Sequence, residues 1–160
     1  MASTALLLGE STRTLDDRYR LTLPGELLDA LSPEDGECLL LKERPGCLSL
    51  WSPSEAEEKL RQGRLILESK IQAGRLEQRT QEVQTLGRLL STRQCRVALA
   101  GRGRFVIPDG FREFLGVAPG GALVVVGAAV CVELWNPEHW AAAIGDQMPN
   151  FRNLFEDLTA

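Results

Sequence analysis

Short apolar runs, bounded by glycine, proline and polar residues, recur along the chain. Runs of three to six residues with such boundaries are typical of β-strands and are too short for most helices. The predicted strands are Leu21–Leu23, Cys38–Leu41, Cys47–Trp51, Phe105–Ile107, Leu123–Val126 and Val130–Trp135. With the helices described next, they predict an α+β fold.

Two prolines, each placed directly after a predicted strand, indicate short helices. A proline at the first position of a helix costs little, because the N–H that it lacks would have no partner there. Apolar residues then recur at helical spacing. The sequence therefore predicts helices over Gly25–Leu31, after Pro24, and Asp109–Leu115, after Pro108.

The middle of the chain has the pattern of two longer helices. Ser54 and Glu57 fit a capping box, which predicts a helix from Ser54 to about Lys70. Gly74 interrupts the pattern, and a second helix is expected over Leu76–Leu90.

The end of the chain also has a helical pattern. Asn136 followed by Pro137 predicts a capped helix start. Four apolar residues at helical spacing predict a short tail helix, either docked on the body or free to bind a partner: Phe151, Leu154, Phe155 and Leu158.

An internal repeat appears at an offset of 84 residues. Eleven identities relate residues 15–53 to residues 99–137 without a gap. The identical pairs are Leu15/Leu99, Arg18/Arg102, Arg20/Arg104, Pro24/Pro108, Leu31/Leu115, Gly36/Gly120, Cys47/Cys131, Leu50/Leu134, Trp51/Trp135 and Pro53/Pro137. Leu39 and Leu123 also match. The duplication predicts two copies of one unit that share a β core. We expect a first repeat at 8–53, intervening helices at 54–91, a second repeat at 92–137 and a helical tail at 138–160.

Composition is that of an ordinary globular protein, with 44% hydrophobic and 25% charged residues among 160. No run approaches the roughly 18 apolar residues that span a membrane. The first ten residues lack the basic flank of a signal peptide. We therefore expect a cytoplasmic protein with no membrane partner.

Signatures of enzymes and of metal sites are missing from the sequence. The four cysteines form no C-x-x-C pair, and the single histidine, His139, is interpreted as a packing residue. No G-x-S-x-G, phosphate loop or H-E-x-x-H motif occurs. We expect no enzyme activity, no cofactor and no small-molecule substrate. A small hydrolase or metal enzyme is the weakest alternative.

The charge is unevenly distributed. The net charge is −4, yet no acidic residue lies between Glu82 and Asp109. That stretch holds five arginines: Arg88, Arg93, Arg96, Arg102 and Arg104. One face is therefore expected to be basic although the whole protein is acidic. The alternative is a solvated arginine face without a function.

Two arginines stand two residues apart at the start of the first predicted strand of each repeat. The first repeat has Arg18-Tyr-Arg20 and the second has Arg102-Gly-Arg104. Alternation along an extended chain would put both arginines of a pair on one side. A guanidinium binds phosphate oxygens and guanine edges, and a β-element carrying it can enter a DNA groove. These four, with Arg13, are the candidate DNA-binding residues.

Carboxylates beside these turns leave an alternative open. Asp16, Asp17 and Asp109 lie close to the arginines in sequence. In that interpretation the arginines are surface residues that form ion pairs.

The segment from Leu15 to Pro24, LDDRYRLTLP, resembles the D-x-K-G-R signature of AbrB/SpoVT-type swapped-hairpin domains. Two such motifs in one short chain, with helices between them and Trp-x-Pro after each, resemble the MraZ family over about residues 5–145. The resemblance implies a double-ψ or swapped-hairpin β-barrel formed by both halves together. It also implies a ring-shaped, octamer-like homo-oligomer that regulates transcription by binding direct repeats in the promoter of the division and cell-wall gene cluster.

The match to the motif differs between the repeats. Asp16 and Gly103 are the motif acid and glycine, which support the turn, whereas the corresponding positions hold Ala100 and Tyr19. If the glycine position needs a positive φ, Tyr19 is expected to be strained.

Together these observations predict a sequence-specific DNA-binding transcriptional regulator associated with the nucleoid. Its partners would be double-stranded promoter DNA and further copies of itself. Several arginine turns in one ring would engage successive DNA repeats, which raises the overall affinity. The alternative is an oligomeric scaffold or interaction protein on the same fold, which the net acidity and the altered motif positions favour.

Overall fold

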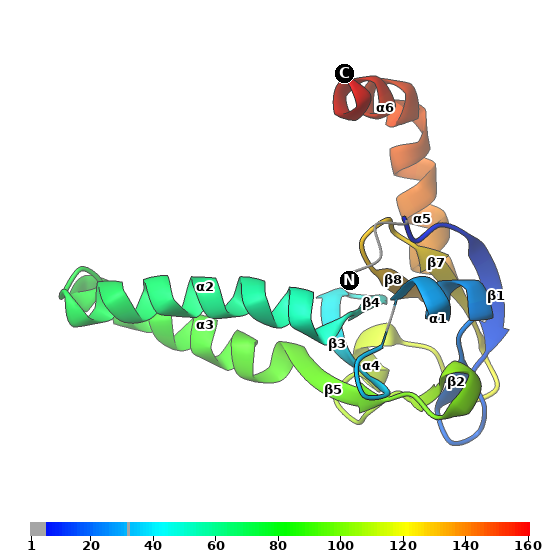
Figure 1. The fold of residues 1–160 in the computed structure, drawn as a ribbon, viewed down its shortest axis with the longest axis horizontal. Helices are drawn as coiled ribbons and strands as arrows, with labels where there is room; N and C mark the ends of the chain where they lie inside the picture. The colour runs from blue at the N-terminus through cyan, green and yellow to red at the C-terminus, as the bar shows by residue number, and fades with distance from the viewer. Residues whose placement is uncertain (1–5, 32) are drawn as a thin grey trace.

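The computed structural model describes residues 6–31 and 33–160, which form a β-rich body with two projecting helical arms (Figure 1). The strands are β1 (Glu10–Thr14), β2 (Arg20–Thr22), β3 (Glu37–Arg44), β4 (Cys47–Trp51), β5 (Gln94–Ala98), β6 (Arg104–Val106), β7 (Ala122–Gly127) and β8 (Val132–Trp135). The α-helices are α1 (Gly25–Leu31), α2 (Pro53–Gln72), α3 (Thr80–Arg93), α4 (Arg112–Leu115), α5 (Pro137–Gln147) and α6 (Phe151–Thr159). Single 3-10 turns are η1 (Glu77–Arg79), η2 (Gly101–Gly103) and η3 (Met148–Asn150). The fold is α+β, as predicted.

Six strands form an antiparallel sheet whose order is symmetric about its centre. The order is β1-β7-β8-β4-β3-β5, and β2 and β6 pair separately as a two-stranded ribbon. Ser49 pairs with Glu133 between β4 and β8, and Leu21 pairs with Phe105 in the ribbon. Each pair joins residues that are 84 apart in sequence. An approximate twofold axis therefore relates the two repeats.

The repeats exchange their first strands. β1 of the first repeat pairs with β7 of the second, and β5 of the second pairs with β3 of the first. The ribbon likewise takes one strand from each repeat. The two repeats therefore build one shared core.

The offset between the repeats changes by one residue in β3 and β7. Trp51 pairs with Leu39, whereas its equivalent Trp135 pairs with Val124. Leu39 therefore corresponds to Val124, and the expected match of Leu39 with Leu123 is wrong by one position.

The inserted residue lies in the turn that follows α4. The N–H of Leu99 donates to the carbonyl of Gly36, and the N–H of Leu15 donates to that of Gly121. Gly36 thus corresponds to Gly121 rather than to Gly120. The first repeat restores the 84-residue offset through a register shift between Lys42 and Arg44 in β3.

The main core lies between one face of the sheet and the ribbon. Alternate residues of the four inner strands are buried there, as expected for a period of two. From the sheet these are Cys38, Leu40, Leu48, Leu50, Leu123, Val125, Val132 and Leu134. The ribbon contributes Leu21 and Phe105, and α1 and α4 contribute Leu31 and Leu115. On the other face a smaller cluster forms around Trp135, whose ring lies 5.4 Å from that of Trp140 in α5.

Three predicted helix starts are wrong, among them that of the second central helix, which begins at Thr80 rather than at Leu76. The helix after the first repeat begins at Pro53, and Ser52 rather than Ser54 precedes it as the cap residue. Pro53 lacks an N–H and suits the first helical position, so the capping box at Ser54 does not form. In the second repeat only Arg112–Leu115 is helical, because Gly110 has a φ of +85° and keeps the preceding residues in a turn.

Other helix predictions are confirmed. The first helix covers Gly25–Leu31. Gly74 interrupts the central helices with a φ of +73°, and Asn136 caps α5 by accepting a hydrogen bond from the N–H of Glu138. The central pair ends later than expected, at Arg93.

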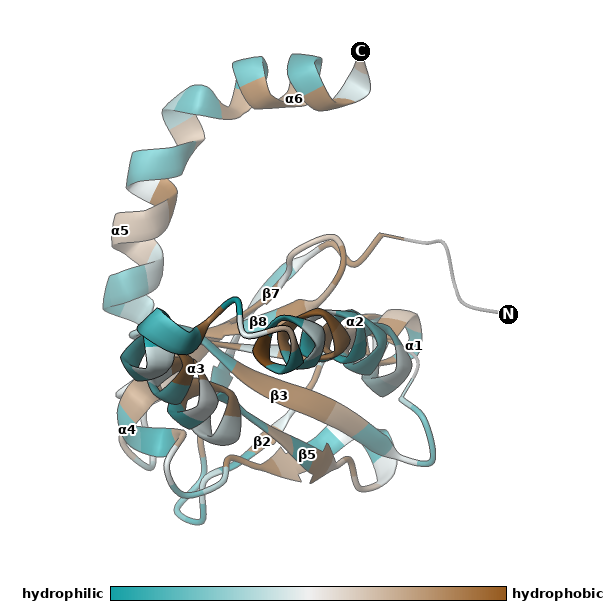
Figure 2. Ribbon diagram, turned by 90° about the vertical axis from the view of Figure 1, so that its left-hand side faces the viewer, coloured by the Kyte–Doolittle hydropathy of each residue, from teal (hydrophilic) through white to brown (hydrophobic). Residues whose placement is uncertain are grey.

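The two arms leave the body in different directions (Figures 1 and 2). One is the hairpin of α2 and α3, and the other is α5, η3 and α6. The tail helix is formed as predicted, but none of its residues, all of which the structure describes, is buried, so it is not docked on the body. No helix in residues 6–31 and 33–160 is long and apolar enough to cross a membrane.

Candidate nucleic-acid interface

The β2–β6 ribbon brings one arginine from each repeat onto a single exposed face. Leu21 and Phe105 point into the core, so their strand neighbours point outward. The outward residues are Arg20 and Thr22 of β2 with Arg104 and Val106 of β6. Arg20 lies opposite Val106, and Arg104 lies opposite Thr22. The two arginines are therefore diagonal neighbours, about 7–8 Å apart.

Backbone hydrogen bonds fix the two turns to the ends of the ribbon. The N–H of Leu23 donates to the carbonyl of Gly103 at 3.1 Å, and the N–H of Ile107 donates to that of Tyr19 at 2.9 Å. These bonds are equivalent under the approximate twofold axis. Each repeat thus holds the other repeat's turn.

An aspartate closes the turn of the first repeat. Oδ1 of Asp16 accepts hydrogen bonds from the N–H groups of Arg18 and Arg20, both at 2.8 Å. Its Oδ2 accepts from Nε of Arg20 at 2.7 Å. The hydrogen bond from the Arg20 N–H is the main cause that lowers the pKa of Asp16, and the Arg20 guanidinium adds to it. Asp16 therefore links the backbone of the turn to the side chain of Arg20.

The turn of the second repeat is closed by backbone bonds alone. The N–H of Ala100 donates to the carbonyl of Arg104 at 2.7 Å, and the N–H of Gly103 donates to that of Ala100 at 2.9 Å. Arg102 has a φ of +66° and Gly103 a φ of +81°. Within the described residues, the guanidinium groups of Arg102 and Arg104 have no hydrogen-bond or ion-pair partner in the protein.

The glycine position of the motif has a positive φ in both repeats. Tyr19 has a φ of +58°, so the expected strain at this residue is confirmed. Its ring lies under the guanidinium of Arg112, whose Cζ is 4.0 Å from the ring centre. A Cβ on the equivalent Gly103 would lie 3.0 Å from Cδ2 of Leu28, the counterpart of Arg112. In the first repeat Arg112 packs on the ring of Tyr19, and in the second repeat Leu28 occupies the space that a side chain at Gly103 would need.

Arg18 does not follow the alternation on which its side was predicted. Tyr19 lies between Arg18 and Arg20 in a left-handed conformation, and Arg18 belongs to the turn rather than to β2. Arg102 likewise lies in the turn η2, and it and Gly103 have positive φ, so the alternation argument fails for both pairs. The side chain of Arg18 is exposed and has no ion-pair partner among the described residues.

Arg13 lies apart from the other four candidates, which we call the turn arginines: Arg18, Arg20, Arg102 and Arg104. It sits in β1 opposite Leu123, whose side chain is in the core. Its Nε is buried and has no hydrogen-bond partner within the described part of the chain. The equivalent residue in the second repeat is Val97, which is a core residue. The surroundings of Arg13 therefore differ from those of the other four candidates.

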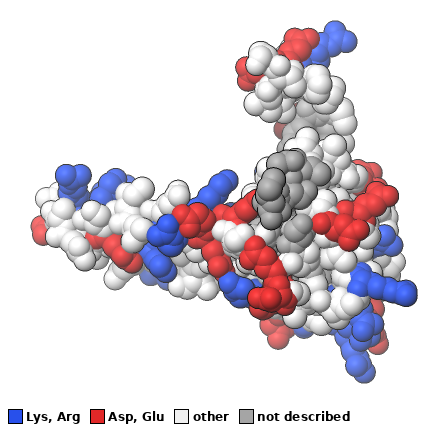
Figure 3. All heavy atoms as spheres, viewed as in Figure 1, with Lys and Arg blue, Asp and Glu red and all other residues white. Residues whose placement is uncertain are grey.

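Part of the expected basic stretch is neutralised locally. Arg93 pairs with Glu43, and Arg96 pairs with Glu57 and lies 3.8 Å from Glu37. Of the five arginines, Arg93 and Arg96 therefore contribute little to the expected basic face. In Figure 3, basic side chains still project from the end of the body that carries the ribbon, at the lower right.

Ion pairing with neighbouring carboxylates explains one of the four turn arginines. Arg20 pairs with Asp16, whereas the nearby Asp109 pairs with Arg112 at 2.9 Å. Only Nε of Arg20 takes part, so both of its Nη groups remain available. The alternative of purely structural arginines accordingly does not account for the exposed ribbon face.

The four cysteines are free thiols, of which three are buried and Cys95 is half-buried. Burial raises the pKa of Cys38 and Cys131 to about 12 and also raises that of Cys47 and Cys95. High thiol pKa values disfavour the thiolate that nucleophilic or metal chemistry requires. Within the described residues no group of three or more His, Cys, Asp or Glu side chains could hold a metal ion.

No protein-family model matches the chain. A transcriptional regulator MraZ of Roseiflexus castenholzii is 30% identical over 135 residues, which are 84% of either protein. The chain belongs to the MraZ family. Its similarity to a MraZ regulator of Frankia alni extends over 156 residues at 27% identity and covers 96% of both chains. One from Clostridium beijerinckii is 26% identical over 136 residues.

Membership of the MraZ family confirms the family resemblance found in the sequence. MraZ proteins are transcriptional regulators rather than enzymes, so this chain is a transcriptional regulator. Sequence reasoning missed Thr22 and Val106, which share the exposed ribbon face with the arginines. Alternation around the apolar Leu21 and Phe105 is the signal that would have found them.

Proposed function

We propose that the chain binds double-stranded promoter DNA through the exposed face of the β2–β6 ribbon and its two flanking turns. The observation that carries this proposal is that Arg20 and Arg104, from different repeats, share that face. The major groove, about 12 Å wide, admits a two-stranded β-ribbon. Two diagonal residue positions, about 7–8 Å apart on the ribbon backbone, lie within that width.

The four turn arginines have different roles in this proposal. Arg20 and Arg104 lie on the ribbon face and contact base edges, where a bidentate arginine–guanine pair discriminates by about 1–3 kcal/mol. Arg18 and Arg102 lie in the turns outside the ribbon and contact phosphates, which supply affinity without sequence information.

The two turns differ in how firmly they hold their arginines. Asp16 fixes Arg20 through Nε and leaves its Nη groups for DNA. Arg104 has no such partner among the described residues, since Ala100 replaces the acid. We infer that the first turn sets the orientation of the ribbon, while the second adapts to the DNA.

The resemblance to the MraZ family also suggests an assembly and a target. We infer that the shared core is a swapped-hairpin β-barrel formed by repeats at 8–53 and 92–137, and that several chains form a ring. Neighbouring subunits would bind direct repeats, with each added contact acting at high effective concentration. The target is the promoter of the division and cell-wall gene cluster, and the site of action is the nucleoid in the cytoplasm. Neither a cofactor nor a small-molecule substrate has a role in this mechanism.

A scaffold without DNA binding is the competing proposal. The net charge of −4 and the ion pairs of Arg93 and Arg96 favour it. The two proposals differ in what they require of the turn arginines, because a scaffold does not need them exposed and free of partners.

A salt titration of DNA binding tests the proposal. The full chain is added to a labelled duplex from its own upstream region and to a shuffled duplex, between about 50 and 200 mM salt. We expect tighter binding to the natural sequence. Replacing Arg18 and Arg102 with alanine should weaken binding to both duplexes alike and lower the slope of log K against log salt by about 0.9 for each phosphate that the variant no longer binds.

Arg75→Ala is the matched control. This arginine lies in the connection between α2 and α3 and is exposed, so its removal should leave affinity and slope unchanged. Equal slopes for the parent and the Arg18/Arg102 variant would refute the assigned phosphate contacts. Failure of the parent to bind the natural duplex even at the lowest salt would favour the scaffold.

A further inference from the structure

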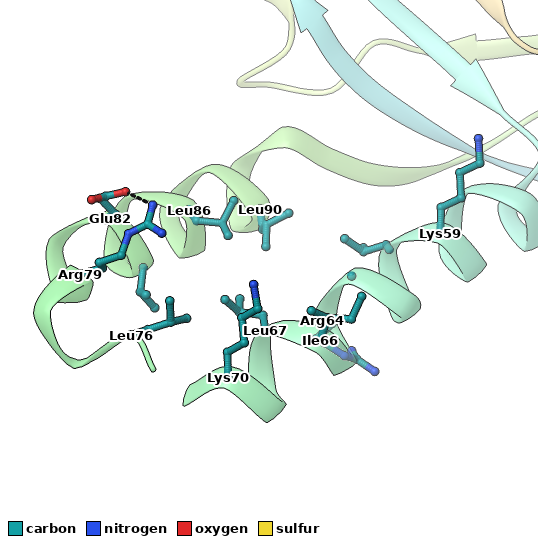
Figure 4. A pocket seen from close by; sticks show the side chains of 13 residues that line it. Lys59, Arg64, Ile66, Leu67, Lys70, Leu76, Arg79, Glu82, Leu86 and Leu90 are labelled. Atoms are coloured by element: carbon teal, nitrogen blue, oxygen red, sulfur yellow. Dashed lines mark hydrogen bonds and ion pairs between the residues drawn. The ribbon is translucent and has the colours of Figure 1, made fainter. Parts of the chain in front are cut away.

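An apolar groove runs between the two helices of the α2–α3 hairpin (Figure 4). Its volume is about 440 Å³. Leu67 of α2 and Leu86 and Leu90 of α3 point into it (Figure 4). Pro53 is the only buried residue of α2, and α3, which is described throughout, has none. The hairpin therefore leaves its apolar seam open to solvent along most of its length.

The tail helix α6 has an apolar face with nothing against it. Its four large apolar residues are between 53% and 74% exposed: Phe151, Leu154, Phe155 and Leu158. Their spacing places them on one side of the helix, which Figure 2 shows as a brown stripe. The rings of Phe151 and Phe155 stack at 5.7 Å. A continuous apolar stripe of this kind marks a binding surface.

We propose that α6 of one copy binds in the α2–α3 groove of a second copy. An amphipathic helix that lays its apolar face in a hydrophobic groove is a common recognition mode, with anchors at i, i+3, i+4 and i+7. The four apolar residues of α6 have that spacing. The proposal rests on the proposed function, which requires several copies of the chain to associate, and it identifies the surfaces through which they associate.

Charge favours this pairing. Residues 53–93 carry eight basic and six acidic side chains, whereas residues 137–160 carry one basic and four acidic side chains. Lys59 and Lys70 line the groove, and Glu156 and Asp157 lie on α6 beside its apolar stripe. Opposite charges around an apolar contact select the partner and the orientation.

The geometry of the chain makes the contact intermolecular. In Figure 1 α6 stands at the end of its own arm, far from the hairpin, which projects from another side of the body. The arm is helical from Pro137 through Thr159 with only η3 between α5 and α6. A groove and a helix that lie apart in one chain bind head to tail between chains, and such contacts close into rings or grow into filaments.

Single substitutions on each side of the contact test the proposal. Phe155→Asp places a charge on the apolar stripe of α6, and Leu86→Asp places one in the groove; both side chains are exposed. Each variant should run as a 17.6 kDa monomer in sedimentation velocity, whereas the parent forms a larger assembly. Asn153→Asp, on the polar side of α6, and Gln81→Asp, on the outer side of α3, add the same charge and should leave the assembly intact.

Mixing the two variants gives the sharper test. The Phe155→Asp chain keeps an intact groove, and the Leu86→Asp chain keeps an intact α6. In the mixture, α6 of a Leu86→Asp chain can therefore bind the groove of a Phe155→Asp chain, and no other such contact can form. We expect a dimer of twice 17.6 kDa that grows no further. A mixture that stays monomeric, variants that keep the parent's mass, or a monomeric parent would each overturn the proposal.

DNA binding separates this failure from failure of the proposed function. The Phe155→Asp chain keeps its turn arginines, so it should bind a single-repeat duplex as each parent subunit does, without the additional affinity from neighbouring repeats. If assembly persists in Phe155→Asp and DNA still binds, only the α6 contact is wrong. If assembly is abolished as expected but no chain binds DNA, the proposed function is wrong and the contact stands.

Discussion

Replacing Gly103 with alanine should destabilise the protein through the turn of the second repeat. Gly103 has a φ of +81° and is buried, and the new Cβ would lie 3.0 Å from Cδ2 and 3.3 Å from Cδ1 of Leu28. The first repeat shows the alternative solution, in which Tyr19 adopts a positive φ and packs under Arg112. Leu28 cannot provide the same support for a side chain at Gly103.

The magnitude follows from three contributions. A non-glycine residue in the left-handed region costs about 1–2 kcal/mol, and moving Leu28 from its preferred rotamer costs about 0.5–1.5 kcal/mol. The lower entropy of the unfolded alanine chain offsets about 0.4–1 kcal/mol of this. The free energy of unfolding should therefore fall by about 0.5–3 kcal/mol, which lowers Tm by about 1–12 °C for a chain of this size.

Thermal unfolding followed by circular dichroism at fixed protein concentration measures this change. Gly101→Ala is the matched control, because its Cβ would meet nothing within 4 Å and its φ is not positive. The control should have an unchanged or slightly higher Tm. Equal Tm values for Gly103→Ala and the control would contradict the positive φ of Gly103 and its close approach to Leu28.

Two further predictions concern titratable groups. The folded state lowers the pKa of Asp16, so the stabilisation it provides is present above its ordinary value of 3.8 and disappears as the pH falls through the folded pKa. Asp16→Asn should therefore be less stable than the parent at neutral pH, and urea unfolding should show the difference shrinking in acid; a constant difference would contradict this. A thiol reagent at about pH 8 should modify Cys95, the half-buried cysteine, well before the others. The three buried thiols, those of Cys38, Cys47 and Cys131, should react only on unfolding. Rapid labelling of all four cysteines would contradict this burial.

The duplication made much of the fold predictable from the sequence. The inner strands are apolar runs because the sheet interior excludes water, so β3, β4 and β7 were expected close to their observed positions. The outermost strands β1 and β5 were not predicted. They lie at the edges of the sheet and pair on one side only, and their sequences, ESTRT and QCRVA, contain no run of three apolar residues.

The candidate site was predictable in its residue types but not in its geometry. The motif pointed to Arg20 and Arg104, and to the support that Asp16 and Gly103 give the turns. That the two arginines share one face depends on β2 pairing with β6 across 84 residues, which no local pattern specifies. Arg13 was expected at the site from its charge alone, whereas its position in β1 is that of the core residue Val97 in the other repeat.

The central claim is that the ribbon arginines bind DNA, and one binding measurement tests it directly. Fluorescence anisotropy with the natural upstream duplex compares the parent with the Arg20→Ala/Arg104→Ala variant, with sedimentation as a check on assembly. At about 1 kcal/mol or more for each arginine–base pairing removed, we predict that affinity falls at least about 30-fold for one subunit and further where several subunits engage. Arg13→Ala should bind like the parent. A double variant that assembles normally and binds with the parent's affinity would contradict the account.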